Sequence, residues 1–132
     1  MDKRFINPEG MVKPGAYTPA ISVSGGRTIY VSGQVAQDAA GNVIGKGDLL
    51  AQTDQVYKNL ATALTAAGAN FNDVVKLNVY VVGYIPEHRA ILQSVRERFV
   101  NKDNPPASTL IGVQALARPE FLVEVEAIAV VG

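Results

Sequence analysis

The spacing of apolar residues changes from that of a helix to that of a strand within Ala51–Val82, AQTDQVYKNLATALTAAGANFNDVVKLNVYVV. Apolar residues in its first half recur every three or four positions, which is typical of an amphipathic helix. These residues are Val56, Tyr57, Leu60 and Leu64. After Gly68 the sequence DVVKLNVYVVG alternates with a period of two, which predicts a strand. Asp48 is the expected N-cap of the helix and Gly68 its expected stop.

The remaining patterns complete an α+β domain. Two β-rich runs flank Gly25-Gly26, which predicts a hairpin over residues 21–36. The segment before it, rich in Pro and Gly, is expected to be irregular, and Tyr17 in this segment could be a lid, a hydrogen-bond donor or a hydrophobic plug. A second helix is expected within residues 86–99, followed by two more strands. The sequence therefore predicts one domain, residues 1–132, with both helices on one face of a mixed sheet.

The two faces of the predicted sheet differ in composition. One face is almost wholly apolar and should lie under the helices; on the later strands it includes Ile111, Val113, Val123 and Val125. The other face is mixed, and it includes Tyr30, Lys76, Ser108, Leu110, Glu124 and Glu126. A plain solvent face would carry more charge, so we expect this face to be partly buried against other copies of the chain. The alternative is a monomer with a patchy open face.

Composition excludes several classes of protein. Twelve Lys and Arg residues balance twelve Asp and Glu residues, so the formal net charge of the 132-residue chain is zero. This balance argues against a nucleic-acid binder and against attachment to a membrane surface. The absence of cysteine excludes thiol catalysis, disulfides and cysteine-ligated metals. The chain shows no secretory signal and no apolar run near the ~20 residues of a membrane span, so we expect a cytoplasmic protein.

Few residues carry the spacing of a known chemistry. Glu124 and Glu126 lie two apart on one strand and point to the same side. Such a pair can divide acid and base roles, or it can form ion pairs with Lys76 or an arginine. Gly33, inside a strand pattern, indicates a bulge or a close approach of a ligand. His88, the single histidine, is expected on the surface, and neither a catalytic triad nor a zinc site can be assembled around it.

Five segments together resemble the Rid family, also called the YjgF or L-PSP endoribonuclease family, over nearly the whole chain. They are PGAY at 14–17, IYVSGQVA at 29–36, AQTDQVYKNLATALTAAGANFNDVVKLNVYV at 51–81, PPAS at 105–108 and VEVEAIAVV at 123–131. The resemblance implies a chorismate-mutase-like fold and a homotrimer with small-molecule clefts between subunits. Archetypal members hydrolyse imines and enamines, such as 2-iminobutanoate and 2-aminoacrylate, to 2-keto acids and ammonia without a metal or cofactor. Other members are described as 2-aminomuconate deaminases or ribonucleases, or have no known activity.

The resemblance also implies a site. Glu124, the first glutamate of VEVE, takes the position of the catalytic acidic residue that is thought to hold the attacking water. Tyr17, Gly33, Ser108 and Leu110 take substrate-binding positions, and no residue takes a metal-binding one.

Ser108 departs from the family pattern, because the family places an arginine there that grips the substrate carboxylate through a planar two-point contact. A serine hydroxyl offers one neutral hydrogen bond, worth ~1 kcal/mol against ~1.5–3 kcal/mol for a charge-assisted one. Two smaller departures are Ala16, where a proline often stands, and Gln93, on or near a family asparagine. The arginines considered as a replacement are Arg27, Arg89 and Arg118.

Three functions remain open. The retained Tyr17, Gly33 and Glu124 predict an imine or enamine deaminase of altered specificity, with Glu124 as the general base. The lost arginine favours a trimeric small-metabolite binding or regulatory module without catalysis. A ribonuclease is the third option, and the neutral net charge argues against it.

Overall fold

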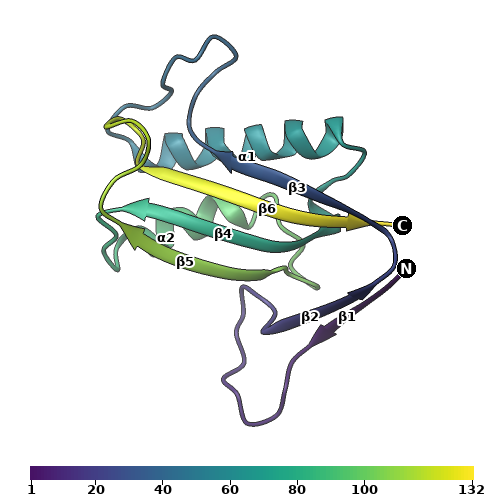
Figure 1. The fold of residues 1–132 in the computed structure, drawn as a ribbon. Helices are drawn as coiled ribbons and strands as arrows, with labels where there is room; N and C mark the ends of the chain where they lie inside the picture. The colour runs from purple at the N-terminus through teal and green to yellow at the C-terminus, as the bar shows by residue number, and fades with distance from the viewer.

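The main sheet has four strands in the order β3-β6-β4-β5 (Figure 1). The computed structural model describes residues 1–132, and these strands are β3 (Arg27–Gln34), β4 (Val74–Val82), β5 (Ala107–Val113) and β6 (Val123–Val131). β6 runs antiparallel to both of its neighbours, whereas β4 and β5 are parallel. The sheet is therefore mixed, as the sequence predicted.

Both helices, α1 (Leu49–Ala66) and α2 (His88–Arg96), lie on one face of this sheet (Figure 1). α1 begins after its predicted N-cap, Asp48, whose side chain accepts a hydrogen bond from the amide of Ala51 (3.1 Å). It ends before Gly68, where a φ of +81° favours glycine. A short 3-10 helix, η1 (Phe71–Asp73), leads from α1 into β4.

One core of 19 buried residues lies between the sheet and the helices. Leu60 and Leu64 from α1 and Val123 and Val125 from β6 are completely buried in it. Burial of each large aliphatic side chain contributes ~1.5–3 kcal/mol, so this core holds the helices on the predicted face. Neither helix is long and apolar enough to cross a membrane.

The predicted hairpin around Gly25-Gly26 is wrong, because β2 (Ala20–Ser24) does not pair with β3. β2 pairs antiparallel with β1 (Asp2–Ile6), a strand that precedes the Pro- and Gly-rich segment and was not predicted. These two strands form a separate small sheet, which projects from the body below the start of β5 (Figure 1). The alternation of β2 identified it as a strand, but alternation alone does not select the partner strand.

The two faces of β5 are the reverse of the prediction. Ser108 and Leu110 are the register partners of Leu77 and Val79, which belong to the core, so they lie on the helix side of the sheet. Ile111, which was expected under the helices, is 40% exposed. β5 is an edge strand that the helices do not fully cover, so its helix-side residues line a pocket instead of the core.

Candidate functional site

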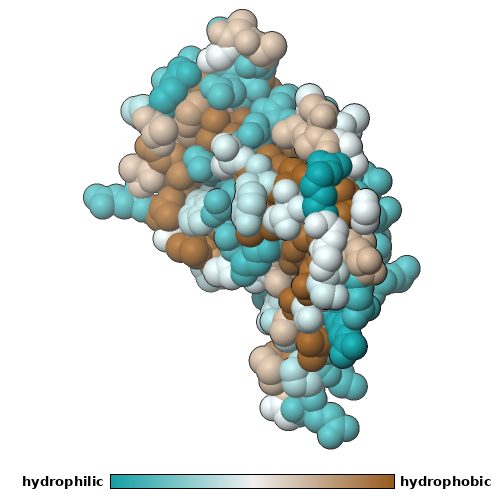
Figure 2. Space-filling model, turned by 45° about the vertical axis from the view of Figure 1, so that its right-hand side comes forward, coloured by the Kyte–Doolittle hydropathy of each residue, from teal (hydrophilic) through white to brown (hydrophobic).

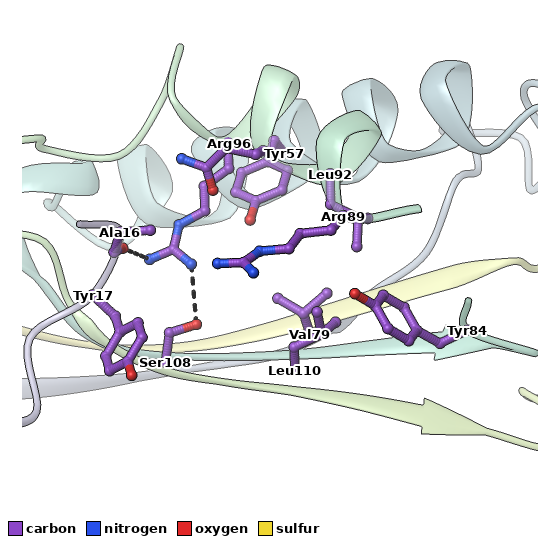
Figure 3. Close-up of a pocket in the computed structure, with 11 residues that line it drawn as sticks. Ala16, Tyr17, Tyr57, Val79, Tyr84, Arg89, Leu92, Arg96, Ser108 and Leu110 are labelled. Atoms are coloured by element: carbon purple, nitrogen blue, oxygen red, sulfur yellow. Dashed lines mark hydrogen bonds between the residues drawn. The ribbon is translucent and has the colours of Figure 1, made fainter. Parts of the chain in front are cut away.

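A pocket of about 270 Å³ opens between α2 and β5, and we call it the α2–β5 pocket (Figure 3). It contains three of the predicted site residues, Tyr17, Ser108 and Leu110. Gln93 from α2 also lines it. The loop that carries Tyr17 is held on β5, because the hydroxyl of Thr18 donates a hydrogen bond to the carbonyl oxygen of Pro105 (2.6 Å).

A guanidinium from α2 fills the space that Ser108 leaves. Arg96 donates a hydrogen bond from Nη1 to Oγ of Ser108 (3.2 Å) and another from Nη2 to the carbonyl oxygen of Ala16 (2.6 Å). Figure 3 shows both bonds and the guanidinium of Arg89 beside that of Arg96. Position 108, where the family resemblance implies an arginine, therefore carries a hydroxyl here, and a guanidinium from α2 lies next to it.

Of the three arginines considered from the sequence, only Arg89 lines this pocket. Arg27 donates to the carbonyl oxygen of Ala67 (3.0 Å), and Arg118 donates to the carbonyl oxygen of Gly41 (3.2 Å). Both are therefore engaged elsewhere in the same chain.

Sequence reasoning missed Arg96, although a signal was present. Arg89, Gln93 and Arg96 are spaced by four and three residues, so they share one face of α2. That face lies next to Leu92, which is buried. The position of Arg96 beside the buried face of α2 was therefore a signal that its side chain could reach the pocket.

The α2–β5 pocket carries positive charge without a negative partner. It is lined by two guanidiniums and no carboxylate, and neither Arg89 nor Arg96 takes part in an ion pair. Burial lowers the pKa of Arg96, but a guanidinium keeps its proton in proteins. Burial raises the pKa of Tyr57 to about 12, so its hydroxyl stays neutral beside these charges. A half-buried cation without a counter-ion is unfavourable, so the pocket is complementary to an anion.

Gly33 and Glu124 meet on the opposite face of the sheet. Glu124 alternates with the core residues Val123 and Val125, so its side chain points away from the helices. A Cβ atom at position 33 would lie 2.7 Å from Cδ of Glu124, so glycine leaves room for the carboxylate in this position. The β3–β6 register also shifts between Val31 and Gln34, which confirms the bulge that this glycine predicted.

The two glutamates differ in their surroundings. Glu126 accepts hydrogen bonds from the hydroxyl of Tyr80 and from Nδ2 of Asn78 (3.3 Å). Glu124 accepts none, and burial, together with the charge of Glu126, raises its pKa. Neither glutamate forms an ion pair with Lys76. A carboxylate with a raised pKa accepts a proton more readily, and Glu124 has no fixed hydrogen-bond partner, which makes it the better candidate for a base.

Gly33→Ala should force the side chain of Glu124 to move and should destabilise the chain by ~0.5–1.5 kcal/mol, the cost of a side chain held off its rotamer. The added methyl group would collide with Glu124, so adding Glu124→Ala should restore most of the loss. Gly15→Ala is a control, because a Cβ atom at Gly15 has no neighbour within 4 Å. Chemical denaturation measures all four chains. Equal stability of Gly33→Ala and Gly15→Ala would contradict the close contact.

Glu124→Gln should raise stability at about pH 7 and have little effect at about pH 4. The pKa of Glu124 is raised above its ordinary value of 4.5, so the folded chain binds this proton more tightly than the unfolded chain. Ionisation of Glu124 therefore destabilises the folded state as the pH rises through the folded pKa, and glutamine cannot ionise. Urea unfolding of both chains at both pH values measures the difference. A stabilisation that persists unchanged in acid would argue against this cause.

The predicted site residues thus fall into two groups on opposite faces of the sheet. Tyr17, Ser108 and Leu110 lie in the α2–β5 pocket, whereas Gly33 and Glu124 lie together on the open face. One chain therefore does not bring all five residues into one cavity.

His88 lies outside both groups. Its Nδ1 accepts a hydrogen bond from the amide of Ile85 (3.2 Å), and its ring contacts that of Tyr84 edge-on. It therefore helps to begin α2. No group of three or more His, Asp or Glu side chains is close enough to hold a metal ion.

The family model described as endoribonuclease L-PSP matches residues 11–131. The structure of YyfB from Yersinia pestis, a Rid-family protein of unknown function, is 44% identical, covers 99% of this chain and 100% of its own, and has a TM-score of 0.92. RidA from an Antarctic Psychrobacter is 30% identical, covers 97% of this chain and 99% of its own, and has a TM-score of 0.70. The 2-iminobutanoate/2-iminopropanoate deaminase of Rattus norvegicus is 36% identical over 118 residues, which are 89% of this chain and 82% of that protein. The chain therefore belongs to the Rid family, to which the endoribonuclease L-PSP model corresponds.

Proposed function

We propose that this protein hydrolyses a small imine or enamine that carries a carboxylate, and that the products are a carbonyl compound and ammonia. One observation carries the proposal: the guanidinium of Arg96 lies at Oγ of Ser108, in a pocket with no acidic residue. A guanidinium binds a carboxylate through two parallel hydrogen bonds. Relatives named as 2-iminobutanoate/2-iminopropanoate deaminases support the reaction class.

The catalytic site would form where two copies of the chain meet. The α2–β5 pocket of one copy would hold the substrate carboxylate, and Gly33 and Glu124 of a second copy would face the reacting carbon. The mixed composition of the open sheet face supports such a contact, because Tyr30 on this face is 78% exposed. A homotrimer, as the family resemblance implies, would contain three such sites.

Glu124 would act as the general base and then as the acid. Its carboxylate takes a proton from water while the water oxygen bonds to the imine carbon, and the C=N electron pair moves to nitrogen. The protonated Glu124 then returns the proton to the nitrogen of the resulting amino alcohol. Glu124 then passes the hydroxyl proton to this nitrogen as the C–N bond breaks, so that ammonia leaves and the carbonyl group forms. An enamine substrate first takes a proton on carbon while its nitrogen loses one, which gives the imine. No cofactor enters these steps.

The test is an assay with 2-aminoacrylate, 2-iminobutanoate and 2-aminomuconate, which differ in size and in the number of carboxylates. We expect release of ammonia above the uncatalysed rate on at least one of them. Rates equal to the background on all three would rule out the proposed reaction for this substrate class.

A binding module without catalysis is the second candidate. The separation of Glu124 from the α2–β5 pocket favours it, because the pocket of a single chain can bind an anion without any contact with Glu124. In that case 2-keto acids should raise the Tm by mass action, with no ammonia released from the three imines or enamines.

A further inference from the structure

The strand β2 is docked so that it cannot pair with β3 of its own chain. The loop before it is fixed on β5: the amide of Thr18 donates to the carbonyl oxygen of Pro106 (3.2 Å), and its hydroxyl donates to the carbonyl oxygen of Pro105. Arg96 holds the same loop at the carbonyl oxygen of Ala16. β2 begins at Ala20, two residues after this anchor.

The distances across the sheet exclude a hairpin in one chain. A tight turn at Gly25-Gly26 would place Ser24 opposite Arg27 and, four residues earlier on β2, Ala20 opposite Val31. β3 and β5 are the two outer strands of the sheet, with β6 and β4 between them. Three spacings of ~4.8 Å separate them by ~14 Å, whereas two residues span at most ~7 Å.

Two strand edges are therefore left without a partner. β2 pairs only with β1, and β3 pairs only with β6. A two-stranded sheet is at best marginally stable alone, and an exposed edge strand of eight residues favours pairing with another chain. The projecting segment formed by β1, β2 and the loop between them also leaves large apolar side chains in solvent, among them Met1 (58% exposed), Met11 (56%) and Val12 (80%). Figure 2 shows apolar atoms continuing from the body onto this projecting part.

We propose that β2 of one copy of the chain pairs antiparallel with the free edge of β3 of a second copy. The sequence around Gly25-Gly26 has the pattern of a hairpin, so the two strands suit one another, and the docked loop leaves β3 of another copy as the available partner. Both glycines have positive φ values (+70° and +82°), which glycine adopts without strain, so this link is compatible with a hairpin and with a chain that leaves β2 in another direction.

This pairing brings the two halves of the candidate site together. In the register that pairs Ser24 with Arg27, the numbers of paired residues add up to 51. Continued to Thr18, two residues before Ala20, this register places Thr18 opposite Gly33. The α2–β5 pocket of one copy, which contains Tyr17, would then lie next to Gly33 and Glu124 of the other. The pairing itself does not require that the site be catalytic.

Cysteine cross-linking tests the pairing, since the chain contains no cysteine. In the proposed register Val23 faces Thr28 as a non-hydrogen-bonded pair, in which side chains are closest. Val23→Cys and Thr28→Cys chains, refolded as a mixture and oxidised, should give covalent dimers on a non-reducing gel. The chain with both substitutions should give covalent species of two or more chains. A mixture of Val23→Cys and Thr62→Cys is the control, because Thr62 is an exposed residue of α1 and should give no specific product.

Two results would overturn the proposal. A disulfide within a single Val23→Cys/Thr28→Cys chain, seen as a monomer that loses two thiols, would mean that the hairpin closes in one copy. The absence of any disulfide, with circular dichroism and Tm unchanged from the parent, would mean that β2 and β3 do not pair at all. Neither result depends on turnover, so a failure here is distinguishable from a failure of the proposed hydrolysis.

Discussion

Glu124→Gln should abolish hydrolysis of the imine substrate, with kcat lowered by ~10²–10⁴-fold, the usual contribution of a general base. Glutamine is close to glutamate in shape, so it should fit against Gly33 as the parent side chain does. It cannot accept the proton of the attacking water. Because Glu124 is not expected to bind the substrate carboxylate, KM should change much less than kcat.

Glu126→Gln is the matched control for this loss. Glu126 is already engaged by Tyr80 and Asn78, so the substitution should retain most of kcat. The charge of Glu126 helps to raise the pKa of Glu124, so its removal should move the acid limb of the pH–rate profile to lower pH. Equal losses of kcat in the two variants, with no shift of the profile, would remove the distinction between the glutamates.

The layers of the fold could be predicted from the sequence because local patterns determine them. Val56, Leu60 and Leu64 specify the core face of α1, and both Asp48 and Gly68 delimit it as expected. The pairing of β2 could not be predicted in this way. Its partner is chosen by the anchoring of a loop onto β5, far away in the sequence, and a two-residue glycine link is compatible with either outcome.

The positions of the candidate site residues could be predicted from the sequence within the central strands but not at the edge of the sheet. Gly33 and Glu124 lie against one another on neighbouring strands, on the face where the sequence pattern placed Glu124. Ser108 was placed on the wrong face, because an edge strand beside an open pocket lacks the apolar pattern of a core strand. Arg96 was missed for a related reason, since the family pattern directs attention to β5 and the guanidinium comes from α2.

Arg96→Leu should weaken the binding of a carboxylate substrate or 2-keto acid product by ~10–150-fold, the equivalent of one charge-assisted hydrogen bond of ~1.5–3 kcal/mol. Leucine removes the cation beside Ser108 and leaves apolar contacts with the rest of the pocket. KM should rise by this factor, and the thermal shift produced by 2-oxobutanoate should shrink accordingly. Arg89→Leu is the matched control: it removes the more exposed guanidinium of the same pocket, which is not anchored on Ser108, so its effect should be smaller.

A guanidinium introduced on β5 distinguishes a role of Arg96 in anion binding from a role in holding the loop that carries Tyr17. Arg96 also donates to the carbonyl oxygen of Ala16, so Arg96→Leu could act by releasing the loop that carries Tyr17. Adding Ser108→Arg to Arg96→Leu restores a cation from the position at which the family resemblance implies an arginine, into the space that leucine leaves. If the pocket requires a guanidinium there, the double variant should regain most of the lost affinity, whereas the Ala16 contact stays broken. If affinity stays low while the double variant keeps the parent Tm, the role of Arg96 is to hold the loop, and the anion would have to bind to Arg89 instead.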